Sequence, residues 1–310
     1  MDRARYLSLL AAGAASALPT VVRAQSSRVR IGAAANDSYA VTYFAQDGGF
    51  FERARIDPDI QIFTNAQAMV QAAAGNAIDV GMADLVQVGN AFNHGVPLGF
   101  IAPAGIYDSK VPTTLICVAK NGPIKTAKDL ENQPVAVVAI AAIGSVAFQE
   151  WIKANGADVS KVKLLELPFS AMAPALSRGT IAAALIAEPF LSSARDDVRA
   201  LGDAQATIAK TFFLSGSFAS RDWVANNRDV ASRLVKAFVA ASVWSNSHHD
   251  ETAVMLAKYA KLDLDKIRTM ARATFATTLD PRMMQPILDI AFKYGELQKP
   301  IRAADLIIPV

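Results

Sequence analysis

From Arg28 onward, the sequence alternates short apolar runs typical of β-strands with longer stretches of helical periodicity. The first set of predicted strands covers residues 29–33, 59–63, 79–82 and 98–102. Helices are predicted between these strands. The helix after Asn65, for example, ends at Gly75, a common residue at helix C-termini. Such alternation indicates an α/β fold, in which helices flank a mostly parallel sheet.

A second set of strands is predicted at residues 113–118, 135–139, 162–167 and 183–186. The two sets resemble each other, because residues 68–82 and 171–185 both show a helix, a glycine stop and a buried strand. Solenoid repeats recur roughly every 20–50 residues, so this longer separation predicts two similar lobes instead. After Phe213 the pattern becomes mostly helical, and we expect these helices to pack around the lobes.

Residues 1–24 have the features of a cleaved signal peptide. Two arginines among the first five residues precede an apolar, alanine-rich stretch at 6–18. Val22-Arg23-Ala24 then places small or medium side chains where a signal peptidase reads them. We therefore predict cleavage before Gln25 and export to the periplasm, by a Sec or a twin-arginine route. Because Gln25 and Ser26, and not a cysteine, come directly after the cleavage point, we expect a free protein without a lipid anchor.

Charge and cysteine content exclude several classes of function. The formal net charge of +3 falls to +1 without the signal peptide, which holds three arginines and one aspartate, and no dense Lys/Arg run suggests a nucleic-acid partner. Cys117 is the only cysteine, so neither an intramolecular disulfide nor a Cys-rich metal site can form. His248, His249 and Asp250 have no further Cys or His nearby in the sequence, which favours a solvated loop over a metal site. We expect neither a metal nor a cofactor.

Several short motifs occur in a specific order and spacing between residues 29 and 262. They are Gly49-Phe50-Phe51-Glu52, Ile78-Asp79-Val80, Asp129-Leu130, Ile143-Gly144-Ser145 and Ala187-Glu188-Pro189. In this respect the chain resembles the family that includes the nitrate, sulfonate, taurine and thiamine-pyrimidine-precursor binding proteins.

The resemblance implies a type II periplasmic binding protein fold. Lobe one would comprise residues 28–111 and 213–310, and lobe two residues 112–212. Two positions depart from the family pattern, since Arg55 replaces the usual glycine of a turn and Ala182 replaces an aspartate of the second lobe.

The resemblance also implies a function. Such a protein is a monomer that captures a small molecule between its lobes and delivers it to an ABC transporter permease in the inner membrane. The family contains a thiamine-pyrimidine synthase as well, so an enzyme of the same fold is the alternative. That enzyme depends on its own histidine, a lysine-bound pyridoxal phosphate and a cysteine-rich stretch, whereas this chain has one cysteine and an export signal.

In open α/β sheets, ligands bind beyond the carboxyl ends of the strands. The loops predicted at that edge are residues 36–39, 84–86, 106–108, 142–145, 169–171 and 187–190. The residues of these loops that we expect to contact a ligand are Asn36, Asp37, Tyr39, Asp84, Tyr107, Gly144, Ser145, Phe169, Ser170 and Glu188.

Several of these residues also have a purely structural interpretation. Gly144 and Ser145 begin a predicted helix, where they bring backbone N–H groups to a ligand or serve as an ordinary cap. Asp37 and Asp84 are equally suited to capping helices, and the aromatic residues of the loops could stack on a ligand or pack in the core. The carboxylate of Glu188 is expected to emerge at the cleft, where it would accept hydrogen bonds from amine or amide groups.

The six loops contain four carboxylates and no Arg or Lys. An anion bound there would depend on helix N-termini alone and would face several negative charges. We therefore predict a small, flat organic ligand that carries hydrogen-bond donors, in preference to a bare inorganic anion. A sulfonate or carboxylate group at one end of a larger ligand, held at Gly144-Ser145, stays open as the alternative.

Overall fold

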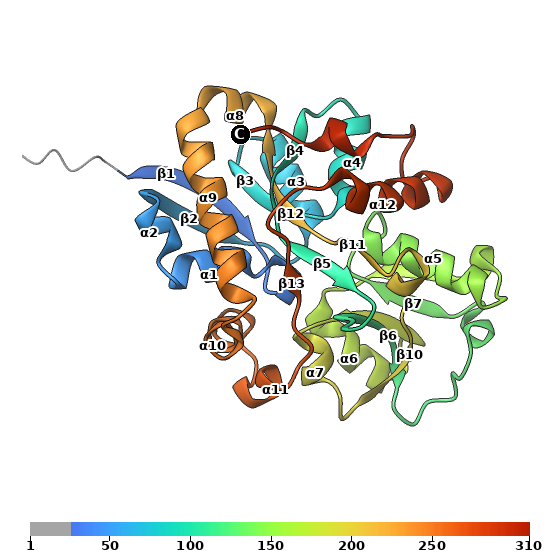
Figure 1. Ribbon diagram of the computed structural model, residues 1–310. Helices are drawn as coiled ribbons and strands as arrows, with labels where there is room; N and C mark the ends of the chain where they lie inside the picture. The colour runs from blue at the N-terminus through green and yellow to red at the C-terminus, as the bar shows by residue number, and fades with distance from the viewer. Residues whose placement is uncertain (1–25) are drawn as a thin grey trace, which may run out of the picture.

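The computed structural model describes residues 26–310 and contains two five-stranded sheets, each flanked by helices (Figure 1). The predicted signal peptide, residues 1–24, lies outside the described residues. The first sheet has the strand order β2-β1-β3-β12-β4, and the second has the order β10-β6-β9-β7-β8. The predicted α/β fold with two separate sheets is confirmed.

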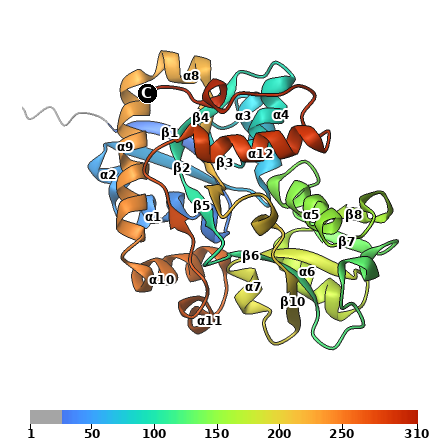
Figure 2. The ribbon, with the colours of Figure 1, turned by 45° about the vertical axis from the view of Figure 1, so that its right-hand side comes forward.

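The first half of the molecule is built on the first sheet. Its strands are β1 (Ser27–Ala33), β2 (Ile56–Ile62), β3 (Val80–Ala83), β4 (Leu98–Pro103) and β12 (Gly216–Ser220). Its helices are α1 (Val41–Asp47), α2 (Phe50–Arg53), α3 (Ala66–Ala74), α4 (Leu85–Asn93), α8 (Arg221–Asn226), α9 (Arg228–Ser245), α10 (His249–Ala260), α11 (Leu264–Arg268) and α12 (Pro281–Lys293). The helices predicted after Phe213 thus pack around this half, and α12 reaches across to the second half (Figure 2).

The second half is built on the second sheet. Its strands are β6 (Thr114–Ala119), β7 (Pro134–Val137), β8 (Lys163–Glu166), β9 (Ala183–Ala187) and β10 (Val198–Gly202). Its helices are α5 (Ile143–Ala154), α6 (Phe169–Ser177) and α7 (Phe190–Ser193), together with the short 3-10 helix η4 (Gln205–Thr207). None of the helices described in residues 26–310 is long and apolar enough to cross a membrane.

All the strands predicted in the two sets are present, with ends that differ by at most three residues. The sheets are less uniformly parallel than expected, because β12 runs antiparallel to both β3 and β4 and β6 runs antiparallel to both β9 and β10. The prediction of mostly helical structure after Phe213 missed β12. This strand, GSFAS, lacks an apolar run of its own and is buried by the strands on either side of it.

The chain passes twice between the two halves, and the two passages pair with each other. β5 (Gly105–Asp108) and β11 (Thr211–Phe213) form an antiparallel ladder, and β13 (Thr274–Phe275) adds to the other edge of β5. The ring of Tyr107 stacks on Phe212 with centroids 4.7 Å apart. These segments therefore join the halves through a hydrogen-bonded strand pair (Figure 1).

Each half has its own apolar core. Aromatic rings fill the first, where Phe51 meets Phe238 edge to face at 5.5 Å and Phe100 meets Phe213 at 5.2 Å. In the second half, side chains alternate across the sheet: Ile116 and Val118 of β6 enter the core on one face, and Cys117 enters the core on the other. The two cores are not fully separate, because Ile143 and Val146 of α5 belong to the core of the first half.

The interior position of β12, between β3 and β4, generates a prediction about stability. A Cβ atom on Gly216 would lie 2.7 Å from the carbonyl oxygen of Ala102 and 2.7 Å from the ring of Phe213. We expect Gly216→Ala to lower the free energy of unfolding by about 1–3 kcal/mol, because the neighbouring strand must shift. Gly75→Ala is the matched control, since a Cβ there meets nothing closer than 3.5 Å. Urea unfolding of both variants checks this, and equal losses would contradict it.

Candidate ligand-binding site

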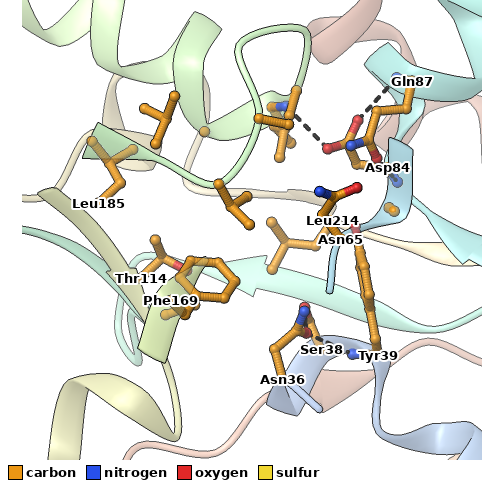
Figure 3. Close-up of a pocket in the computed structure, with 18 of the residues that line it drawn as sticks. Asn36, Ser38, Tyr39, Asn65, Asp84, Gln87, Thr114, Phe169, Leu185 and Leu214 are labelled. Atoms are coloured by element: carbon orange, nitrogen blue, oxygen red, sulfur yellow. Dashed lines mark hydrogen bonds between the residues drawn. The ribbon is translucent and has the colours of Figure 1, made fainter. Parts of the chain in front are cut away.

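A cavity lies between the two halves and is lined by residues from both (Figure 3). The lining residues are Asn36, Ser38, Tyr39, Thr64, Asn65, Ala66, Asp84, Gln87, Thr114, Val137, Val138, Ala139, Ala142, Ile143, Gly144, Phe169, Leu185, Ala187, Gln205 and Leu214. The space among them is about 720 Å³, including the part open to solvent. Most of the lining is apolar, with a few polar groups, as is usual for small-molecule sites.

The cavity lies where the sequence predicts it. The segments that follow β1, β2, β3 and β7 contribute to its wall, together with the starts of α3, α4, α5 and α6. Five of the ten residues expected to contact a ligand line it. These are Asn36, Tyr39, Asp84, Gly144 and Phe169.

Asp84 lies at the junction of the two halves. Its side chain caps α4, because Oδ1 accepts hydrogen bonds from the backbone N–H groups of Val86 (2.9 Å) and Gln87 (3.1 Å). Its other oxygen, Oδ2, accepts a hydrogen bond of 3.1 Å from the N–H of Ile143, the first residue of α5 in the second half (Figure 3). Burial raises the pKa of this carboxyl to about 6 despite the three donors.

The polar groups next to Asp84 are neutral. Asn65 caps α3, since its Oδ1 accepts a hydrogen bond from the N–H of Ala68 at 2.9 Å. The Oδ1 atom of Asn36 accepts hydrogen bonds from the Ser38 hydroxyl (3.0 Å) and the Tyr39 N–H (3.1 Å). Of the described residues that line the cavity, only Asp84 carries a charged side chain.

Gln205 lines the cavity and was missed by the sequence analysis. It is only 3% exposed, and its Oε1 atom has no hydrogen-bond partner among the described residues. It lies in η4, which follows an antiparallel edge strand and not the end of a parallel strand, so the strand-end rule does not find it. The backbone N–H of Gln205 donates to Asp203, which also accepts a 2.7 Å hydrogen bond from the Tyr107 hydroxyl. Tyr107 thereby helps to position Gln205.

The other expected contact residues do not line the cavity. Tyr107 is buried against Phe212, and the Ser145 hydroxyl is buried and donates to the carbonyl of Ala142 at 2.8 Å. Ser170 is exposed and borders a shallower groove outside the cavity. Tyr107 lies within β5 and is held by the pairing with β11, whereas Ser145 turns into the core and Ser170 turns toward solvent.

Two carboxylates expected in the cleft, Asp37 and Glu188, are instead buried beside it. Asp37 pairs with Arg272 at 3.4 Å and accepts a hydrogen bond from the N–H of Ala273, while its own N–H donates to the carbonyl of Glu188. The Glu188 side chain accepts hydrogen bonds from the N–H (3.0 Å) and hydroxyl (2.8 Å) of Ser192. Burial raises the pKa of both carboxyls, that of Glu188 to about 7.

An outer groove continues the cavity toward solvent. Both are bordered by Asn36, Thr64 and Phe169, and the ring of Phe169 stacks on Phe190 with centroids 5.9 Å apart. Ile62, 67% exposed, borders the same groove. Phe190 thus packs against another aromatic ring at the edge of this groove.

The raised pKa of Glu188 predicts a pH dependence of stability. A carboxyl with a folded-state pKa near 7 and an unfolded value of 4.5 stabilises the fold fully below pH 4.5 and loses this contribution as pH rises through 7. When the pH rises from 5 to 8, the free energy of unfolding of Glu188→Gln should therefore increase by about 1–3 kcal/mol relative to that of wild type. Urea unfolding at both pH values measures this, with the exposed Glu52→Gln as control. Parallel wild-type and Glu188→Gln curves would contradict the prediction.

Comparison with known proteins places the chain in a family. The family model described as NMT1/THI5 like matches residues 36–252. A relative named as a putative binding protein, from Brucella abortus, is 21% identical over 303 residues, which cover 93% of this chain and 92% of the relative. This match runs through both halves of the molecule.

Solved structures of low identity share the fold. The alkanesulfonate-binding protein SsuA from Xanthomonas axonopodis, bound to MOPS, has a TM-score of 0.77 at 16% identity, covering 93% of this chain and 100% of that one. The periplasmic nitrate-binding protein NrtA from Synechocystis has a TM-score of 0.75 at 15% identity, with coverages of 90% and 84%. The desulfurization enzyme DSZB has a TM-score of 0.67 at 14% identity, with coverages of 91% and 96%. The chain therefore belongs to the NMT1/THI5-like family and has the periplasmic binding protein fold, as the sequence motifs indicate.

Proposed function

We propose that this protein is the solute-binding component of an ABC importer. It captures a small organic molecule in the cavity between its halves and delivers it to a permease in the inner membrane. The observation that carries this proposal is the cavity itself, which is largely apolar, holds a few convergent polar groups and is walled by both halves. The names of the sulfonate-binding, nitrate-binding and putative binding proteins support the same function.

The proposal includes the location and the organisation of the mature chain. The protein acts as a monomer in the periplasm after loss of residues 1–24. Lobe one comprises residues 28–111 and 213–310, and lobe two residues 112–212. Membership of the two sheets supports this division, since β12 returns to the first sheet after the second is complete.

Ligand binding would work by closure of the lobes. β5 and β11 serve as the hinge, because they are the two passages between the sheets. The closed form gains contacts across the cleft, such as the hydrogen bond from Ile143 N–H to Asp84 and the 2.6 Å ion pair of Lys293 with Glu150. A ligand that contacts both walls binds the closed form better and so shifts the population toward it.

The alternative, an enzyme of the same fold, is not favoured by the cavity. In the part of the chain that the structure describes, no Lys, His or Cys lines it, so it does not fit a lysine-bound pyridoxal phosphate. The Cys117 thiol is fully buried away from it, and burial, with the nearby Glu188 carboxylate, raises the pKa of this thiol to about 12. The cavity hydroxyls of Ser38, Thr64 and Thr114 have no histidine base beside them there.

Binding without turnover is the central expectation. A metabolite library screened by thermal shift should identify a ligand that adds about 2.7 kcal/mol at 100 times its Kd. At about 2–4 °C per kcal/mol, the melting temperature should rise by roughly 5–10 °C. Small-angle scattering should show compaction with that ligand, and the ligand should be recovered unchanged. Chemical conversion of the ligand would support the enzyme, and tight binding without compaction would exclude closure.

Gly144 offers a substitution that separates binding from folding. It is the second residue of α5 and lines the cavity, and a Cβ atom there would make only an ordinary 3.5 Å contact with Leu185. Gly144→Ala should leave the melting temperature of the free protein unchanged or slightly higher. The added methyl group occupies cavity space, so ligand affinity should fall by roughly 5- to 150-fold. Calorimetry measures the Kd of Gly144→Ala, with Gly75→Ala as control. An unchanged Kd would show that Gly144 does not contact the ligand.

A further inference from the structure

The N-terminus of α5 faces the cavity and is occupied by a carboxylate of the protein itself. The first residues of a helix present unpaired N–H groups and a partial positive charge, which together attract anions. α5 is 12 residues long, and its N-cap residue, Ala142, has no polar side chain to satisfy these groups. Asp84 Oδ2 reaches them from the other half and accepts the Ile143 N–H at 3.1 Å.

A second, independent feature of the cavity points to a ligand with hydrogen-bond donors. The Oε1 atom of Gln205 is a buried acceptor without a partner among the described residues, on a side chain that is 3% exposed. Leaving a buried acceptor unpaired is costly, so a ligand that donates to it gains affinity. A bare anion has no N–H or O–H group to offer.

We propose that Asp84 is a specificity-determining residue. Its carboxylate occupies the N-terminus of α5, where an anion would otherwise bind, and so excludes anionic ligands from the cavity. The ligand is then an amide- or amine-bearing organic molecule whose donor pairs with Gln205. This inference rests on the proposed function and specifies its substrate class. A carboxylate accepts about four hydrogen bonds, and three of those of Asp84 are already used within the protein, so one position remains for a ligand donor.

The electrostatic effect of Asp84 is large enough to decide the specificity. A ligand anion at the start of α5 would lie within about 4 Å of this carboxylate, and at the effective dielectric constant of a protein site the repulsion weakens binding by roughly a thousandfold. Among the described residues, no Lys, Arg or His lines the cavity to offset it. Dipoles of helix ends are worth far less than a full charge at this distance.

The test replaces Asp84 by a residue that still caps α4. Serine is a good N-cap, so Asp84→Ser should keep α4 intact, while its single short oxygen cannot also reach Ile143. Asp280→Ser is the control, because Asp280 is also a side-chain N-cap, of α12, and does not line the cavity. Asp84→Asn removes the charge at nearly constant volume and decides the question if Asp84→Ser does not fold.

Calorimetry with methanesulfonate, nitrate and acetate is carried out at pH 8 on wild type and all three variants. We expect no binding below millimolar concentration for wild type and Asp280→Ser, and at least one anion bound roughly 100-fold more tightly or better by Asp84→Ser. Loss of the contact across the cleft alone would weaken the binding of every ligand. A gain in affinity for anions is therefore specific to the proposed role. Micromolar anion binding by wild type, or a folded Asp84→Ser or Asp84→Asn protein that gains none, would overturn it.

The part of the proposal that concerns the hydrogen-bond donor of the ligand is tested at Gln205. Gln205→Met preserves the length of the side chain and removes the unpaired acceptor, so the free protein should be as stable as wild type or more stable. Affinity for an amide or amine found in the metabolite screen should fall about 5- to 20-fold. An unchanged affinity would overturn the assignment of Gln205 to the ligand. If the screen finds no ligand of any class for wild type, the proposed function itself fails, whatever the variants do with anions.

Discussion

The antiparallel pairing of β5 with β11 sets the geometry of the whole molecule. These are the two passages of the chain between its sheets, and their ladder from Thr211–Asp108 to Phe213–Ile106 fixes how the second half is attached to the first. Because both passages leave from the same side, the strand ends and helix starts of the two halves face each other across one cleft. Most apolar residues pack within their own half, whereas Ile143 and Val146 of α5 join the core of the first half.

The three buried carboxylates beside the cleft differ in the donors from which they accept hydrogen bonds. Asp37, Asp84 and Glu188 all follow strands at the cleft, yet each carboxylate is buried and each is satisfied by a different set of donors. Asp37 pairs with Arg272 and accepts a hydrogen bond from Ala273. Glu188 accepts hydrogen bonds from Ser192. These contacts stabilise the loops behind the cavity. Asp84 differs because one of its oxygens bonds across the cleft.

The fold could be predicted from the sequence wherever a strand carries its own apolar run or a helix its own stop signal. Residues 68–82 and 171–185 do indeed hold equivalent elements, the end of α3 with β3 and the end of α6 with β9. β12 could not be predicted in this way, because its small residues are buried by neighbours that are distant in sequence. For the candidate site, half of the residues chosen by the strand-end rule line the cavity. The rule could not show which way Ser145 or Tyr107 turns, since helix packing and the β5–β11 ladder decide that.

The exposed ion pairs across the cleft are individually weak, which suits the proposed opening and closing of the lobes. The pair of Lys293 with Glu150 and the pair of Lys266 with Asp196 both lie at the solvent-exposed rim, with side-chain exposures of 45% and 20% and of 32% and 74%. Exposed pairs of this kind contribute about 0–1 kcal/mol each. Neither ion pair is strong enough to lock the halves together, which is compatible with the proposed closure by a ligand. In the proposed mechanism, a ligand that binds the closed form about a hundredfold better shifts the equilibrium by the same factor.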